Sequence, residues 1–66
     1  MTTHSLNRFL SASHVEEILS LSRVTVWRMV KAREFPPPIR ISRGRVAWLE
    51  SDVRAWIAAK SEQKTR

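Results

Sequence analysis

Three consecutive prolines, Pro36 to Pro38, divide this 66-residue chain into two parts that must form separate elements. Proline has no backbone N–H and a fixed φ, so neither a helix nor a central strand can run through this segment. Phe35, which precedes the run, is also pushed towards extended geometry. A three-proline run can serve as a ligand for aromatic grooves, but its place between two patterned segments favours a stiff, extended spacer.

The first helix is predicted over residues 14–20. Ser13 and Glu16 form a Ser-x-x-Glu capping box, in which each side chain satisfies one free amide of the first turn. Before it, Phe9 and Leu10 predict an extended lead-in that packs its aromatic ring against the core. The apolar stripe that this helix would bury consists of Val15, Ile18 and Leu19.

The second helix is predicted over residues 23–32, with Ser22 as its N-cap. Two short helices joined by about three residues form a helix-turn-helix. The helix has two unlike faces. The face expected to join the core carries Val26, Met29 and Val30, and the opposite face carries Val24, Trp27, Arg28 and Lys31.

A β-hairpin is predicted over residues 39–48, with the single glycine, Gly44, in a two-residue turn. The expected register pairs Ser42 with Arg45, Ile41 with Val46, and Ile39 with Trp48. This register places all four apolar side chains on one face and leaves Arg40 and Ala47 on the other.

A last helix is predicted over residues 50–60, since acids at its start and Lys60 at its end suit the helix dipole. Its apolar stripe consists of Leu49, Val53, Trp56 and Ile57. The expected fold class is mainly α with a small β-hairpin, as a winged helix-turn-helix. One domain over residues 8–60 would stand between a flexible tail, residues 1–7, and a polar tail, residues 61–66.

The chain offers no candidate for catalysis, cofactor binding or metal binding. It has no cysteine, and His4 and His14 are not at ligand spacing. A single glycine excludes a phosphate-binding glycine loop, and no serine has a histidine or lysine placed to activate it. No apolar run approaches the length of a membrane span or a signal peptide, so a cytoplasmic protein that is not an enzyme is expected.

The net charge of +6 is confined to one third of the chain. Residues 23–45 carry seven cations and one acid, whereas the cations and acids outside this segment balance. The cations of this basic segment are Arg23, Arg28, Lys31, Arg33, Arg40, Arg43 and Arg45. Such a segment is typical of a protein that binds a polyanion, and double-stranded DNA is the partner that suits a helix-turn-helix.

The second helix fits the major groove, where residues near its N-terminus reach the base edges. Arginines can pair with guanine or a phosphate, and Val24 can touch a thymine methyl. Trp27 can either complete the edge of the core or lie against the sugar-phosphate backbone. The predicted DNA contacts of the helix are Ser22, Arg23, Val24, Thr25, Trp27, Arg28 and Lys31, and those of the hairpin are Arg40, Ser42, Arg43 and Arg45.

Five motifs, in this order, resemble the AlpA family of small phage and prophage regulators: Arg-Phe-Leu, Ser-Arg-x-Thr-Val-Trp-Arg-Met-Val-Lys, Phe-Pro-x-Pro-Ile-Arg-Ile, Val-Ala-Trp and Asp-Val-x-Ala-Trp-Ile. They cover residues 8–57. That family is similar to phage excisionases and to the DNA-binding part of MerR regulators. The resemblance implies sequence-specific DNA binding that controls a prophage integrase gene or directs recombination in excision, at the nucleoid of a bacterium, with integrase or RNA polymerase as further candidate partners.

Two positions depart from the family pattern. Ser20 stands where the family commonly has glycine between the helices, and Arg33 stands where glycine often follows the second helix. At both positions glycine would ease a left-handed turn, which costs other residues about 1 kcal/mol.

Composition leaves a second function open, in which Val24 and Trp27 anchor a protein partner such as an integrase or polymerase subunit, because aromatic residues and arginine are favoured anchors. RNA binding is less favoured, since A-form RNA hides the major groove that the second helix would enter. A monomer that can bind DNA cooperatively is the expected state.

Overall fold

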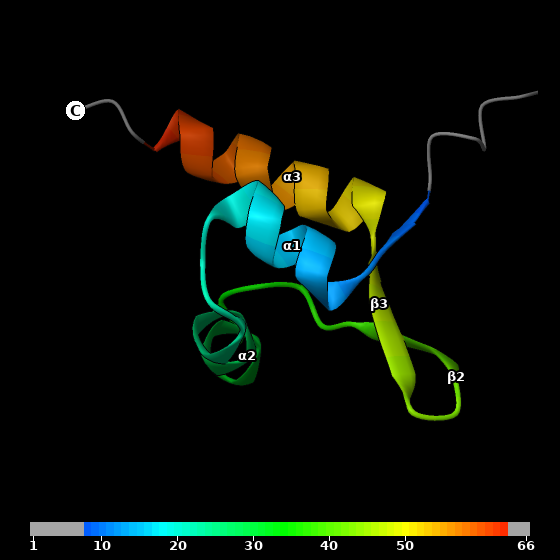
Figure 1. Ribbon diagram of the computed structural model, residues 1–66. Coiled ribbons are helices and arrows are strands. Elements are labelled where there is room, and N and C mark those ends of the chain that lie inside the picture. The colour runs from blue at the N-terminus through cyan, green and yellow to red at the C-terminus, as the bar shows by residue number, and fades with distance from the viewer. Residues whose placement is uncertain (1–7, 64–66) are drawn as a thin grey trace, which may run out of the picture.

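The computed structural model describes residues 8–63. They form three helices and one small antiparallel sheet, which confirms the mainly α class with a minor β component (Figure 1). In chain order the elements are β1 (Phe9–Leu10), α1 (Ala12–Leu19), α2 (Arg23–Lys31), β2 (Ile39–Ser42), β3 (Arg45–Leu49) and α3 (Glu50–Glu62). The predicted tail at residues 1–7 and the end of the polar tail, residues 64–66, lie outside the described residues.

Trp48 is at the centre of the core and is fully buried. Its ring packs against Trp27 and Phe35, with centroid separations of 5.5 Å and 6.1 Å. The other buried residues of this core cluster are Leu10, Val15, Val26, Phe35 and Val53. They come from β1, α1, α2, the segment after α2, and α3, so one tryptophan on β3 is surrounded by side chains from every other part of the fold except β2.

The N-terminal lead-in is extended as predicted, but it joins the sheet as a third strand. β1 pairs with β3, with Phe9 opposite Leu49 and Leu10 opposite Trp48, which makes β3 the central strand. Neighbouring residues of a strand point to opposite faces. Leu10 therefore enters the core beside Trp48, while Phe9 remains 52% exposed, so the prediction that the aromatic ring packs on the core was wrong.

Helix α1 begins two residues earlier than predicted because Ser11, not Ser13, is its N-cap. The Ser11 hydroxyl accepts a hydrogen bond from the His14 backbone N–H at 3.1 Å. The earlier start removes the predicted capping box with Glu16. Val15 is fully buried and Leu19 packs against the core, but Ile18 is 46% exposed and does not belong to the buried stripe as predicted.

Helix α2 has the predicted N-cap: the Ser22 hydroxyl accepts a hydrogen bond from the Thr25 backbone N–H at 3.2 Å. The helix ends at Lys31, one residue before the predicted end, with Ala32 as its C-cap. Val26 is buried, and Met29 and Val30 are partly buried against the core, as predicted.

The two departures from the family pattern are the non-glycine residues with positive φ among the described residues. Ser20 ends α1 at φ 58°, and Arg33 follows α2 at φ 63°. Both residues are in the left-handed region, where a side chain costs roughly 1 kcal/mol relative to glycine.

We expect Ser20→Gly and Arg33→Gly each to raise the free energy of unfolding by up to about 1 kcal/mol, because relief of the left-handed strain exceeds the added chain entropy. Thermal or urea unfolding measures the change. Ala59→Gly, at an exposed position inside α3, is the control and should lower stability by about 1 kcal/mol. A loss of stability in both turn variants would contradict the expectation.

The hairpin has the predicted turn at Gly44, whose φ is 75°, and the predicted pair of Ser42 with Arg45. Beyond this pair the predicted register was wrong. A β-bulge lies between Arg40 and Ser42, so Val46 is opposite Arg40 instead of Ile41. The extra residue shifts the remaining pairs by one, which places Ile39 opposite Ala47 instead of Trp48.

The bulge changes which side chains the hairpin buries. Ile39 and Ile41 are 38% and 44% exposed, so they are not part of a continuous apolar underside. Ala47, which the predicted register left on the exposed face, is buried.

The proline segment lies outside the helices and strands, and it is held by two indoles. Trp48 Nε1 donates to the Pro36 carbonyl oxygen, and Trp56 Nε1 donates to the Glu34 carbonyl oxygen, both at 2.7 Å. Phe35, between these two acceptors, is buried and packs edge-on against Trp56 with centroids 5.0 Å apart.

Helix α3 extends to Glu62, two residues beyond the prediction, and carries the expected acids in its first turn and Lys60 in its last. Its start is tied to β1: the Glu50 backbone N–H donates to the Arg8 carbonyl at 2.7 Å, and Arg8 Nε donates to the Glu50 carboxylate at 3.0 Å. The hydrogen bond from Arg8 lowers the pKa of Glu50. This contact therefore stabilises the fold at neutral pH and is lost as the pH falls through the lowered pKa.

None of the helices in residues 8–63 is long and apolar enough to cross a membrane.

Candidate functional site

The basic segment is displayed on the surface. All seven of its cations are exposed, and within residues 8–63 only Arg23 among them forms an ion pair. The remaining six have no carboxylate of the described residues within 4.0 Å and place their positive charge in solvent. These six unpaired cations are Arg28, Lys31, Arg33, Arg40, Arg43 and Arg45.

Helix α2 turns one side away from the core. Val24 is 65% exposed, and Arg28 and Lys31 are also exposed. Val24 and Arg28 are four residues apart and share a face, with Lys31 one turn further on. We call these three residues the outward face of α2. In Figure 1, α2 and the hairpin tip both lie on the side of the molecule away from α3.

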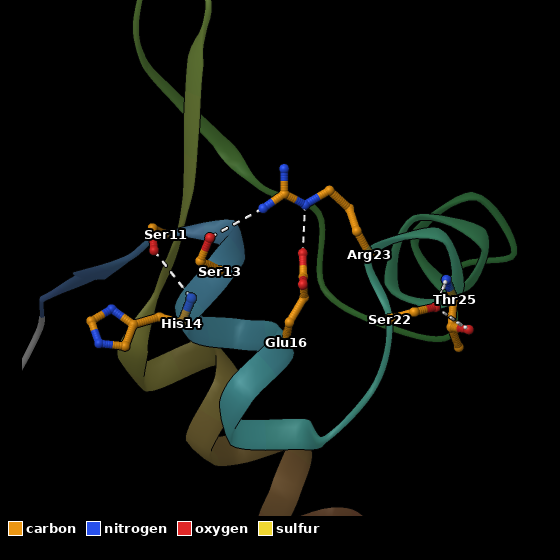
Figure 2. A network of polar contacts seen from close by, with 7 residues as sticks. All are labelled: Ser11, Ser13, His14, Glu16, Ser22, Arg23 and Thr25. Carbon is orange, nitrogen blue, oxygen red and sulfur yellow. Dashed lines mark hydrogen bonds and ion pairs between the residues drawn. The ribbon is translucent and has the colours of Figure 1, made fainter.

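Thr25 and Ser22 are joined at the start of α2. Their hydroxyl oxygens are 3.0 Å apart and hydrogen-bonded, in addition to the bond from the Thr25 backbone N–H (Figure 2). Thr25 is partly buried, while Ser22 is exposed. Of the two α2 residues with a hydroxyl predicted to contact DNA, Ser22 is therefore the more accessible, although its hydroxyl also serves as the helix cap.

Trp27 lies at the edge of the core. Its ring is tilted against Trp48 and the residue is partly buried against the core cluster. The first of the two roles that the sequence left open for Trp27 is thus present in the structure, and Trp27 is three residues from Val24 and four from Lys31, so it adjoins the outward face of α2.

Arg23 does not stand free, although it is exposed. Its Nε donates to the Glu16 carboxylate, and its Nη2 donates to the Ser13 hydroxyl at 3.2 Å (Figure 2). These contacts join the first residue of α2 to α1. Ser13 and Glu16 were predicted to form a helix cap, but in the structure both contact the guanidinium of Arg23.

The predicted hairpin residues are all exposed. Arg40 and Ser42 lie on β2, Arg43 is in the turn, and Arg45 begins β3. Gly44 supplies the positive φ at the turn, and beyond its two chain neighbours no heavy atom lies within 4 Å of the position that a Cβ would take there. The tip is therefore a narrow, open turn with an arginine on either side of the glycine.

An apolar hollow of about 540 Å³, which the sequence analysis did not anticipate, lies between the end of α2, the proline segment and α3. Trp56 was predicted only as part of an apolar stripe and Phe35 only as an extended residue before proline, and no sequence pattern signals that the bend after α2 leaves a gap beside them. Lys60 covers part of the Trp56 ring, with its Nζ 5.6 Å from the centroid. The hollow is lined by Val30, Arg33, Glu34, Phe35, Pro36, Pro37 and Trp56.

No group of three or more histidine, cysteine or acidic side chains that could hold a metal occurs in residues 8–63. The chemistry available at the surface described above is that of cations, three hydroxyls, one valine and part of an indole. These groups can bind phosphates and base edges without a cofactor.

Comparisons with known proteins agree with the family resemblance that the five sequence motifs indicate. Residues 8–61 match the protein family described as prophage CP4-57 regulatory protein (AlpA). The chain is also 37% identical over 59 residues to the uncharacterized protein ORF88 of Enterobacteria phage P4, in a match that covers 89% of this chain and 67% of the phage protein. No solved structure matches the chain. Since the family match extends from β1 almost to the end of α3, the chain belongs to the AlpA family of prophage regulatory proteins.

Proposed function

We propose that this protein is a sequence-specific double-stranded DNA-binding regulator with a winged helix-turn-helix architecture. Helices α1 and α2 are the helix-turn-helix, and the β2–β3 hairpin is the wing. The observation that carries the proposal is the set of six unpaired, exposed cations in α2, the segment after it and the hairpin. A surface with this excess of positive charge suits a phosphate backbone.

The outward face of α2 is the proposed reading surface. A nine-residue helix fits the major groove, which is about 12 Å wide. Arg28 can donate two hydrogen bonds to guanine, and Val24 can contact a thymine methyl. Lys31, Ser22 and Thr25 supply further polar contacts to phosphates or bases, with the accessible edge of Trp27 against the backbone.

The wing is the proposed second contact. Arg43 and Arg45 on either side of Gly44 are placed to reach a neighbouring groove or its phosphates. Arg40 and Ser42 on β2 extend this contact along the strand. Because these groups lie on a narrow turn, we expect them to add affinity without much sequence preference.

Membership in a family of prophage regulatory proteins supports a regulatory role in a bacterial cell, at the nucleoid. The proposed target is a site that controls an integrase gene, or an attachment site at which the protein acts as an excisionase. Integrase and RNA polymerase are the further partners that these two roles would require. We propose a monomer in solution that can bind cooperatively on repeated sites.

Selection of bound fragments from a random duplex pool tests the proposal and yields the site and its repeat spacing. A salt titration on the recovered duplex then tests the electrostatic part. If about five phosphates are neutralised, the log-log slope of affinity against salt concentration should be roughly −4 to −5. Recovery of no common sequence, or an affinity that does not change with salt, would contradict the proposal.

The second candidate function is a protein-docking module that uses Val24 and Trp27. Val24 is the most exposed large apolar side chain in residues 8–63, which favours it as a contact. The contact of Trp27 with Trp48 leaves less of its ring for a partner, so we rank this function second. Capture of integrase or a polymerase subunit that survives nuclease and high salt would support it.

A further inference from the structure

Arg23 points in a different direction from the outward face of α2. Arg23 and Arg28 are five residues apart, which separates their directions by about 140° around a helix axis, whereas Val24 and Arg28 share a face. The structure shows where the guanidinium goes: it reaches back across the turn to Glu16 and Ser13 of α1 (Figure 2). The charge of Arg23 is balanced by Glu16, and two of its donors are already used.

The turn that this contact closes sets the direction of α2. It contains Ser20 in a left-handed conformation that a non-glycine residue adopts only at a cost. A helix of nine residues is roughly 13 Å long, so a tilt of about 10° at the turn would move its far end by roughly 2 Å. A displacement of that size changes which base edges the outward face reaches.

We propose that Arg23 is a positioning residue: its ion pair with Glu16, supported by the Ser13 hydroxyl, fixes the angle between α1 and α2 at which the outward face of α2 reads DNA, and Arg23 itself does not contact DNA. This inference rests on the proposed DNA binding. Arg23 was predicted from the sequence to contact DNA, and the inference instead makes it a residue that positions α2 relative to α1.

Glu16→Gln distinguishes the two roles by the sign of its effect. If Arg23 contacted DNA and its ion pair with Glu16 competed with that contact, the variant would free the arginine, remove a negative charge and tighten binding. If Arg23 positions α2, the same variant weakens binding although the protein becomes more positive. Glu17→Gln is the matched control, because it makes the same charge change at an exposed neighbour that has no ion pair within residues 8–63.

The experiment measures Kd on the duplex recovered from the random pool and on a scrambled duplex. We expect Glu16→Gln to weaken binding to the recovered duplex about two- to fivefold, the upper part of the range that an exposed ion pair contributes, and Glu17→Gln to leave it unchanged or slightly tighter. The charge-swapped double variant Glu16→Arg, Arg23→Glu should recover affinity to near the wild-type value, because it restores the pair. A tighter Glu16→Gln complex would overturn the inference.

A second measurement does not depend on the stability of a variant. The Arg23 Nε–H resonance of the wild-type protein should keep its chemical shift when the recovered duplex is added, since its partner remains Glu16. A large shift of that resonance, or an Arg23→Ala variant that folds and lowers the salt slope by about 1, would show a phosphate contact and overturn the inference. If the wild-type protein binds no duplex, the proposed function is overturned instead. Binding by the wild-type protein is therefore measured before any variant is compared.

Discussion

Trp48→Ala is expected to lower the free energy of unfolding by about 3–5 kcal/mol, the range for removing a buried tryptophan or phenylalanine. Trp48 is fully buried, contacts Trp27 and Phe35, and donates a hydrogen bond to the Pro36 carbonyl. A chain of this length has a total stability of only roughly 3–10 kcal/mol. We therefore expect the variant to be largely unfolded at 37 °C, as measured by circular dichroism and urea unfolding.

Two further variants separate packing from hydrogen bonding at this position. Trp48→Phe keeps a ring in the core but leaves the Pro36 carbonyl without its donor, and an intermediate loss of about 1–3 kcal/mol is expected. Val24→Ala, at a 65% exposed position, should stay within about 0.5 kcal/mol of the wild-type protein. If Trp48→Ala melted like Val24→Ala, the central position of Trp48 in the core would be wrong.

Arg28→Ala is expected to weaken binding to the preferred duplex about 10- to 100-fold and to relax sequence preference, because a bidentate contact with a base contributes about 1–3 kcal/mol of discrimination. Binding to a scrambled duplex should fall much less, since only an electrostatic contribution is lost there. Competition binding with both duplexes measures the ratio. An equal loss on the two duplexes would show that Arg28 contacts phosphates and does not read bases.

Arg43→Ala is expected to give the opposite pattern, a similar loss on both duplexes with the salt slope reduced by about 1. Arg54→Ala is a charge-matched control on α3, where the side chain forms an exposed pair with Glu50, and it should change affinity by no more than about twofold. A specificity change in Arg43→Ala would contradict the division of roles between helix and wing.

Local patterns were sufficient to predict the helices and the turns. Ser22 caps α2 as expected, Val26 enters the core, and the left-handed positions at Ser20 and Arg33 follow from the comparison with a glycine pattern. At the start of α1, however, Ser11 and Ser13 are both suitable caps, and sequence alone could not choose between them. Tertiary contacts decide, because a start at Ser11 leaves Ser13 and Glu16 available to Arg23.

The errors in the sheet have one cause, which is that pairing depends on residues far apart in the chain. Alternation predicted a hairpin with one apolar face, but a bulge at residue 41 needs no special residue and shifts Ile39 by one pair. The pairing of Phe9 with Leu49 crosses the whole domain and has no local signal. The basic segment, in contrast, was visible in the sequence because exposure of charge follows directly from residue type.

For the proposed interface, Arg23 shows that residue type alone does not predict which cations contact DNA. An arginine at the start of a helix in a basic segment is a reasonable DNA contact, and only the structure reveals that an acid seven residues earlier lies within reach. The spacing between Glu16 and Arg23 spans a turn, so no helical periodicity predicts it.

The two indole hydrogen bonds to the proline segment bear on the thermodynamics of binding. Trp48 and Trp56 hold the backbone on both sides of Phe35, so the separation between α2 and the hairpin is set in the free protein. A ligand that contacts both elements at once would then pay little conformational entropy to order the segment between them. A change in the length of that segment would disturb this separation and raise the entropy that binding has to supply.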